Sequence, residues 1–249
     1  MEIKIFVDKA EMGKVVAKKA AEILKEAIKL RGKASFICAT GAAQFDFLEA
    51  LTKEKGIDWK KTAMFHLDEY VGISENSPAS FRRYLRERLI TKVRPGEVNL
   101  IDGDSVRAEY ECEKLSKIIS QYKIDVAFVG IGENCHLAFN DPPADFKTDK
   151  PFIVVELNDR CKQQQVNEGW FKTKEDVPKH AITMTITQIM KSQNILCLVP
   201  EKRKAEAVKN CLEGDICSDH PASILRMHPN VYFYLDKESS SLLSKKKSK

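Results

Sequence analysis

The feature that most constrains the fold of this chain is the regular alternation of short apolar segments with longer amphipathic ones. Residues 34–39 and 124–130 are apolar runs of strand length. From Met12 to Leu30, by contrast, apolar residues recur every three or four positions, which indicates a helix. Strands that alternate with helices predict an α/β fold, here a single doubly wound domain with a mostly parallel sheet and helices on both faces.

The same patterns assign the rest of the chain. Further strands are expected at residues 2–7, 63–67, 98–101, 152–156, 195–199 and 231–235. Further helices are expected at residues 45–51, 80–90, 107–122, 182–191, 201–212 and 222–226. No linker rich in glycine, proline or serine divides them, so residues 1–238 are expected to form one domain. The lysine-rich residues 239–249 are expected to form a basic, frayed tail.

Composition excludes several classes of protein. Hydrophobic residues make up 43% of the 249 residues and charged residues 31%, which suits a chain with a core and excludes a wholly disordered one. No apolar run approaches the roughly 20 residues that span a bilayer, and the first residues lack the apolar block of a signal peptide. The seven scattered cysteines include no C-x-x-C pair, which favours a reducing, cytoplasmic setting. The net charge of +5 comes with no nucleic-acid-binding motif, so we expect neither a nucleic acid nor a membrane as partner.

In a doubly wound sheet the ligand binds beyond the carboxyl ends of the strands, so the residues that follow apolar strands are the candidates for chemistry. The first such segment is Thr40-Gly41-Ala42-Ala43. Its glycine permits a sharp turn with open N–H groups, and a following helix adds positive charge at its N-terminus, which suits a phosphate. Taken alone, this segment is better explained as an ordinary tight turn between strand and helix, because it has neither a Walker lysine nor a G-x-G-x-x-G motif.

A second strand end carries adjacent acids, Asp68 and Glu69. Neighbours on a strand point to opposite sides, so only one of the two carboxylates can enter a cleft. Such a carboxylate can act as a general base toward a carbon-bound proton if partial burial raises its pKa. A solvated turn or a salt-bridged pair is the alternative.

The most specific strand end is the segment from Gly130 to Asp141, where polar residues are packed among apolar ones. Asn134 lies two residues before His136 and Asp141 lies five after it, so both can hold the imidazole in one tautomer. A partly buried structural histidine is the alternative. The other histidines lack the spacing of metal ligands, so no metal site is expected.

These segments, in this order, resemble the glucosamine-6-phosphate deaminase family, also called glucosamine-6-phosphate isomerase. The most specific motifs are LDEYVG at residues 67–72 and GIGENCHLAFNDP at residues 130–142, and the similarity extends from the first strand to about Asp236. The wider group includes 6-phosphogluconolactonases, which favour D-E-R and G-H-T-A-S-L-F-P at the matching places. Because this chain has D-E-Y and A-F-N-D-P, it resembles the deaminase branch.

The resemblance implies a hydrolase and isomerase of amino-sugar metabolism that converts glucosamine 6-phosphate to fructose 6-phosphate and ammonia in N-acetylglucosamine catabolism. It implies no metal and no organic cofactor. Asp68 would move a proton between C2 and C1 of the open-chain sugar, and His136 would assist ring opening. Asn134 and Asp141 would orient His136. The residues expected to bind the 6-phosphate are Thr40, Gly41, Ala42, Ala43 and Lys204.

The chain also departs from the family pattern. It has Cys135 where the family often has glycine and Asp141 where the family has glutamate. The phosphate loop lacks the hydroxyls that usually follow its glycine. Gly169 stands where a phosphate-binding lid arginine is expected, and the nearby cations that can replace it are Arg160, Lys162 and Lys172. Residues 143–150 lack an arginine of an allosteric amino-sugar site, so no such control is expected.

Three alternatives remain at the level of sequence. The chain can be a galactosamine-6-phosphate isomerase, a 6-phosphogluconolactonase or a non-catalytic sugar-phosphate sensor. No DNA-binding helix-turn-helix segment accompanies the domain, which argues against the sensor. The expected partner is a small sugar phosphate, and the resemblance allows monomers, dimers and hexamers, so homo-oligomers are included.

Overall fold

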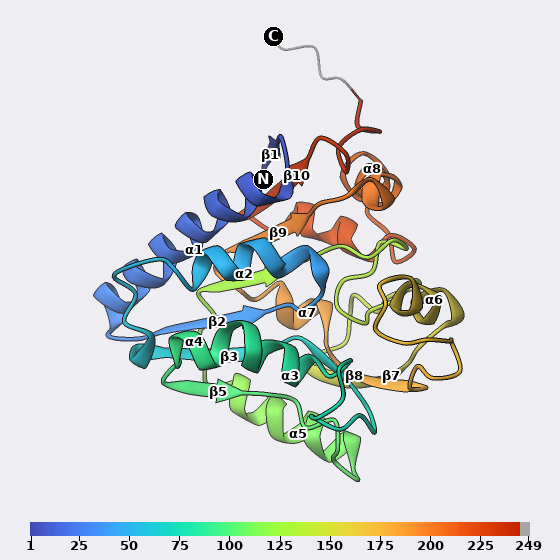
Figure 1. Cartoon of the computed structure of the whole chain (residues 1–249), viewed down its shortest axis with the longest axis horizontal. Helices are drawn as coiled ribbons and strands as arrows, with labels where there is room; N and C mark the ends of the chain where they lie inside the picture. Colours follow the sequence, from blue (N-terminus) through green and yellow to red (C-terminus); the bar gives the residue numbers. More distant parts are fainter. Residues whose placement is uncertain (245–249) are drawn as a thin grey trace.

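The computed structural model describes residues 1–244 and contains a twisted sheet with helices on both faces (Figure 1). The larger sheet has seven strands in the order β1-β10-β9-β6-β2-β3-β5, and every neighbouring pair is parallel. Its strands are β1 (Glu2–Phe6), β2 (Ala34–Cys38), β3 (Thr62–His66), β5 (Glu97–Asn99), β6 (Val126–Val129), β9 (Ile195–Val199) and β10 (Val231–Asp236). The expected doubly wound α/β architecture is therefore confirmed.

Helical segments connect these strands. The α-helices are α1 (Lys9–Arg31), α2 (Phe45–Leu51), α3 (Phe81–Leu85), α4 (Thr91–Val93), α5 (Ala108–Ile119), α6 (Asp159–Asn167), α7 (Ile186–Ile189) and α8 (Ala205–Glu213). Short 3₁₀ segments are η1 (Ala42–Gln44), η2 (Trp59–Lys61), η4 (Lys202–Lys204) and η5 (Pro221–Met227), while η3 (Arg86–Ile90) is a π-helical turn. The helix α1 begins where the Asp8 side chain accepts a hydrogen bond from the Glu11 N–H, and it ends at Gly32 with a φ of 76°.

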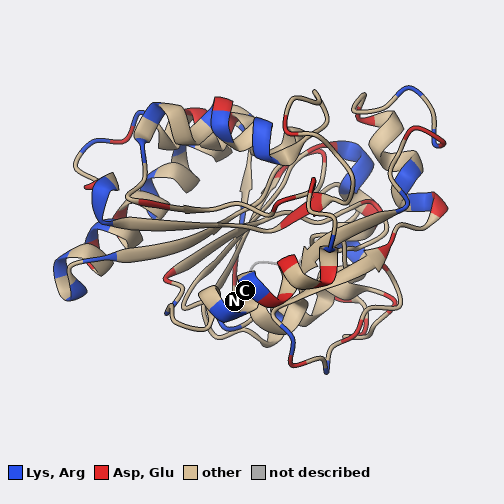
Figure 2. Cartoon of the chain, turned by 90° about the horizontal axis from the view of Figure 1, so that it is seen from below, with Lys and Arg blue, Asp and Glu red and all other residues tan. Residues whose placement is uncertain are grey.

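Two apolar layers cover the two faces of the large sheet. On β2, Phe36 and Cys38 pack into the layer formed with α1 and α2, whereas Ile37 packs into the opposite layer with α5, α7 and α8. This alternation follows from the two-residue period of a strand. Figure 2, turned by 90°, shows the sheet between these layers, with basic and acidic segments intermixed over the outer helices and loops. A strand that is buried on both faces explains why β2 and β6 are almost continuously apolar.

The order of the strands reverses next to β2. From β2 the chain proceeds through β3 to β5 on one side of the sheet, whereas β6, β9 and β10 lie on the other side. The loops that follow β2 and β6 therefore turn away from each other at the carboxyl ends of these strands. A crevice opens at this point in folds of this type. At the far edge, the first strand lies beside the last one, with Glu2 opposite Tyr232 in the ladder.

A second, smaller sheet corrects part of the sequence prediction. It is antiparallel and consists of β4 (Asp68–Tyr70), β8 (His180–Met184) and β7 (Phe152–Glu156). Residues 182–191 were predicted as one helix, but their first residues belong to β8 and only α7 is helical. The prediction was wrong because Ile182, Ile186 and Ile189 fit the helical period, while the pairing of β8 with two distant strands is not visible locally.

The C-terminal segment is ordered further than expected. Ser239 is fully buried and its N–H donates to Asp236, while the Ser244 hydroxyl donates to Glu213 on α8. Residues 239–244 therefore pack against the domain rather than fraying from it. The basic residues 245–249 of the predicted tail lie outside the described residues. Within the described part of the chain, no helix is both long and apolar enough to cross a membrane.

Candidate active site

A cleft lies at the carboxyl ends of β2, β3, β6 and β9, next to the reversal of strand order. Segments 39–44, 67–68, 130–132 and 198–200 form its floor, and side chains from α6 and the residues after it cover one side. Seven of the residues predicted from sequence line this cleft: Thr40, Gly41, Ala42, Ala43, Asp68, His136 and Lys204. The other two, Asn134 and Asp141, lie behind His136 and contact it.

The two adjacent acids on β4 point in opposite directions. Asp68 faces the cleft with 7% of its surface exposed, and burial, followed by the charge of Glu69, raises its pKa to about 8. Glu69 is fully buried on the other side, where it accepts hydrogen bonds from the Ser80 hydroxyl and the Arg82 N–H at 3.0 and 2.8 Å. Glu69 therefore fixes the start of α3, and only Asp68 is available to a ligand.

The loop after β6 places His136 beside a carboxylate. Nδ1 of His136 lies 3.2 Å from Oδ1 of Asp141, and the Asn134 amide donates to the same oxygen at 2.8 Å. Burial alone would raise the pKa of Asp141, but the hydrogen bond and charge of His136 and the Asn134 amide outweigh it and lower that pKa. An ionised Asp141 accepts the Nδ1 proton, which leaves Nε2 of His136 for a ligand.

Close backbone packing keeps the His136 ring in place. A Cβ at Gly132 would overlap the imidazole, so only glycine fits there. Two other residues of the loop adopt the left-handed region without being glycine, Cys135 with a φ of 70° and Ala138 with a φ of 54°. The family glycine at position 135 is thus replaced by a residue for which this conformation is unfavourable, at a cost of roughly 1–2 kcal/mol.

The opposite end of the cleft is suited to an anion. Gly41 has a φ of 97°, which glycine alone adopts easily, and its carbonyl accepts a hydrogen bond from the Tyr84 hydroxyl at 2.9 Å. Lys204, on η4, lines the same cleft as this loop and is only 5% exposed. Burial lowers the pKa of its ammonium group, and the charge of Glu168 opposes that change. No ion pair among residues 1–244 includes Lys204, so its charge is directed at the cleft.

Two charged residues of the cleft were not identified from the sequence. Arg203, beside Lys204, and Glu168, just after α6, both line it. Of the cations proposed in place of the lid arginine, Arg160, Lys162 and Lys172, none lines the cleft. A local signal for Arg203 existed in the run Glu-Lys-Arg-Lys at residues 201–204, but its contacts come from segments 35 and 70 residues away along the chain.

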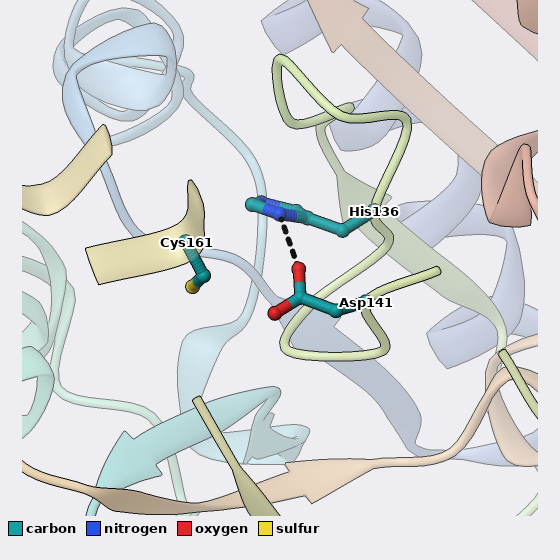
Figure 3. A group of neighbouring side chains, drawn as sticks. All are labelled: His136, Asp141 and Cys161. Carbon is teal, nitrogen blue, oxygen red and sulfur yellow. Dashed lines mark hydrogen bonds and ion pairs between the residues drawn. The ribbon is translucent and has the colours of Figure 1, made fainter. Parts of the chain in front are cut away.

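One group of described residues has the atoms of a metal site. His136, Asp141 and Cys161 place a nitrogen, an oxygen and a sulfur within 4.8 Å of one another (Figure 3). Burial, followed by the charge of Asp141, raises the pKa of the Cys161 thiol, which disfavours the thiolate that a metal requires. Figure 3 also shows Asp141 bonded to His136, an arrangement that suits proton transfer by the imidazole.

Comparison with known proteins finds relatives that match most of this chain. The family described as Glucosamine-6-phosphate isomerases/6-phosphogluconolactonase matches residues 7–233. A glucosamine-6-phosphate deaminase of Listeria monocytogenes serotype 4a (strain HCC23) is 36% identical over 227 residues, which cover 91% of this chain and 95% of the relative. One of Bacillus cereus (strain B4264) is 32% identical, with 92% of this chain and 86% of the relative covered.

Solved structures agree in fold. A monomeric glucosamine-6-phosphate deaminase superposes with a TM-score of 0.89 and 31% identity, covering 97% of this chain and 100% of its own. A 6-phosphogluconolactonase from Thermotoga maritima superposes with a TM-score of 0.78 at 20% identity, covering 95% of this chain and 99% of its own. The latter likeness shows a common fold alone.

Proposed function

The chain belongs to the Glucosamine-6-phosphate isomerases/6-phosphogluconolactonase family, and on this premise we propose that it converts glucosamine 6-phosphate to fructose 6-phosphate and ammonia. One observation carries the proposal. Asp68 and His136, which come from different strand ends, line the same cleft as the buried ammonium group of Lys204. One cleft thus offers two groups for proton transfer and a cation for the far end of a sugar phosphate.

His136 acts first. The hydrogen on C2 of an aldose is acidic only when the ring is open and C1 is a carbonyl, so a proton must reach the ring oxygen. With Asp141 accepting from Nδ1, Nε2 of His136 exchanges this proton. The Asn134 side chain donates to Asp141 and accepts from the backbone N–H of His136 at 3.2 Å, so it holds both residues in place.

Asp68 then moves the proton from C2 to C1. A carboxylate with a pKa of about 8 is a stronger base than an exposed one, although only about a tenth of it is ionised at pH 7. Return of the proton to C1 leaves an imine at C2, and water releases ammonia from it to give the ketose. A positioned acid or base of this kind contributes roughly 10²–10⁴ in rate.

The phosphate is held away from these groups. Thr40, Gly41, Ala42 and Ala43 line the cleft and can offer their backbone N–H groups to the phosphate, and Lys204 supplies the charge. Binding at the far end then orients C2 toward Asp68. All seven cysteines are free thiols, which supports activity in the reducing cytoplasm.

The proposal is tested by an assay that follows fructose 6-phosphate and ammonia from glucosamine 6-phosphate. 6-Phosphogluconolactone is offered in parallel because the family description includes 6-phosphogluconolactonase, and galactosamine 6-phosphate is offered to test the preference between epimers. We expect turnover of glucosamine 6-phosphate by the wild type and a loss of at least about a hundredfold in kcat for Asp68→Asn. The control is Asp58→Asn, at an exposed acid outside the cleft. Equal kcat values for the wild type and Asp68→Asn would remove Asp68 from the mechanism.

A further inference from the structure

Arg203 is surrounded by carboxylates at the anion end of the cleft. Its Nη1 donates to Glu133 at 2.8 Å and to Glu168 at 3.0 Å, and its Nε donates to Glu201 at 2.8 Å. These partners come from the loop after β6, from the end of α6 and from the turn before η4. Together with Lys204 the corner holds two cations and three carboxylates, so negative charge is in excess where an anion should bind.

Glu168 differs from the other two carboxylates because it lines the cleft. Its side chain is 9% exposed and accepts hydrogen bonds from the Gln164 amide at 2.9 Å and the Trp170 indole at 3.2 Å. Burial alone would raise the pKa of Glu168, but the charges of Lys204 and Arg203 outweigh it and lower that pKa. An ionised carboxylate therefore occupies the corner that faces Lys204.

An ionised Glu168 and a bound phosphate are in conflict. Two anions that share the same cations in a partly buried site repel each other strongly, because the effective dielectric constant is low. A phosphate also satisfies a guanidinium better than one carboxylate oxygen, since it offers several acceptors for charge-assisted hydrogen bonds. Glu168 is followed by Gly169, whose φ of 80° is a backbone conformation that glycine adopts more easily than other residues.

We propose that Arg203 is a second cation of the substrate's anion site, and that Glu168 is an internal anion which occupies Arg203 until the substrate's phosphate replaces it. This inference rests on the proposed function for the identity of the anion. It makes Arg203, rather than a cation of the α6 region, the partner of Lys204 in this chain. Glu168 becomes a residue that sets the affinity for phosphate without touching the reacting carbons.

The test measures binding apart from turnover, with inorganic phosphate titrated calorimetrically into the full-length protein. We expect Glu168→Gln to bind phosphate about tenfold more tightly than the wild type, because Gln keeps the shape and one acceptor oxygen for Gln164 and Arg203 but loses the charge and the hydrogen bond from the Trp170 indole. Arg203→Gln should bind about tenfold more weakly. When Glu168→Gln is added to Arg203→Gln, the gain in phosphate affinity should be smaller than when it is made in the wild type, because the two side chains interact.

The matched control is Glu206→Gln, which removes an exposed acid on α8 outside the cleft and should change phosphate affinity less than twofold. Unfolding temperatures of all variants report whether each one folds. In turnover, Glu168→Gln should lower KM for glucosamine 6-phosphate more than it changes kcat, which a purely structural role would not produce.

Several results would overturn the inference. Unchanged or weaker phosphate binding by folded Glu168→Gln would exclude an internal competitor. If Glu168→Gln raised the phosphate affinity equally in the wild type and in Arg203→Gln, Glu168 would act only on Lys204. Absence of phosphate binding to every variant would exclude the anion site. If phosphate binding changes as expected but no protein releases ammonia, the proposed function fails while this inference stands.

Discussion

The two ends of the cleft are prepared in different ways. At the end with Asp68 and His136, burial raises the pKa of the proposed base, and the Asp141 carboxylate already holds the imidazole. At the end with Lys204 and Arg203, a carboxylate of the protein, Glu168, already occupies Arg203. The difference indicates that the reacting end is preorganised, whereas the anion end must exchange an internal partner for the substrate.

The largest expected effect comes from displacing His136 while the residues of the anion end stay unchanged. In Gly132→Ala the new Cβ overlaps the imidazole of His136 and forces the ring away from its position against Gly132. We expect kcat to fall by roughly a hundredfold, the contribution of one positioned proton transfer. Phosphate affinity, measured by calorimetry, should stay within about twofold of the wild type, because the anion end is untouched. A parallel loss of phosphate affinity would show that the two ends are not separate.

The pH dependence should come from the reacting end. Asp68 is active when ionised, so with a pKa of about 8 the value of kcat/KM should rise about tenfold from pH 6 to 7, about fivefold from pH 7 to 8, and level off above. Below pH 7 the titration of the substrate phosphate also contributes, and phosphate binding measured separately corrects for it. A profile that is flat between pH 7 and 8 would contradict a buried base at position 68.

The same shift predicts a change of stability with pH. The pKa of Asp68 is higher in the folded chain than its ordinary value of 3.8, so the fold favours the protonated acid. This contribution is complete below about pH 4 and is lost as pH rises toward 8. Asp68→Asn keeps a neutral side chain at every pH. Its free energy of unfolding relative to the wild type should therefore rise with pH by at most about 1.4 kcal/mol per unit between these limits. Denaturant unfolding at pH 5 and pH 8 measures it.

The smallest effect concerns the backbone of the reacting end. Ala138 has a φ of 54°, which glycine adopts without steric cost. Ala138→Gly should therefore raise the free energy of unfolding by about 0.5 kcal/mol, after the larger entropy of the unfolded glycine is subtracted. The gain should appear as a higher unfolding temperature. A lower temperature would show that packing of the Ala138 methyl group outweighs its backbone conformation.

The sequence predicted the reacting end better than the anion end, for a physical reason. His136, Asn134 and Asp141 lie within eight residues of one another, so their contacts are set by one loop and are visible locally. The strands that carry these loops are apolar on both faces and were located to within a few residues. The opposite directions of Asp68 and Glu69 followed from the period of a strand.

The missed features all depend on distant pairings. The strand β8 gains its hydrogen bonds from β4 and β7, and only those partners distinguish it from the start of a helix. The helix α6 and Glu168 were missed because residues 159–168 contain few apolar side chains and show no clear helical period. Arg203 acquires its role from Glu133 and Glu168, which lie far away along the chain.

The pairing of β1 with β10 has a consequence for how the chain is made. A ribosome releases the strand at Glu2–Phe6 long before Val231–Asp236, with which it pairs in the sheet. Until Val231–Asp236 has been made, the strand at Glu2–Phe6 lacks the backbone hydrogen bonds of this pairing. Its short length and the charged side chains of Glu2 and Lys4 limit pairing with other nascent chains during that delay.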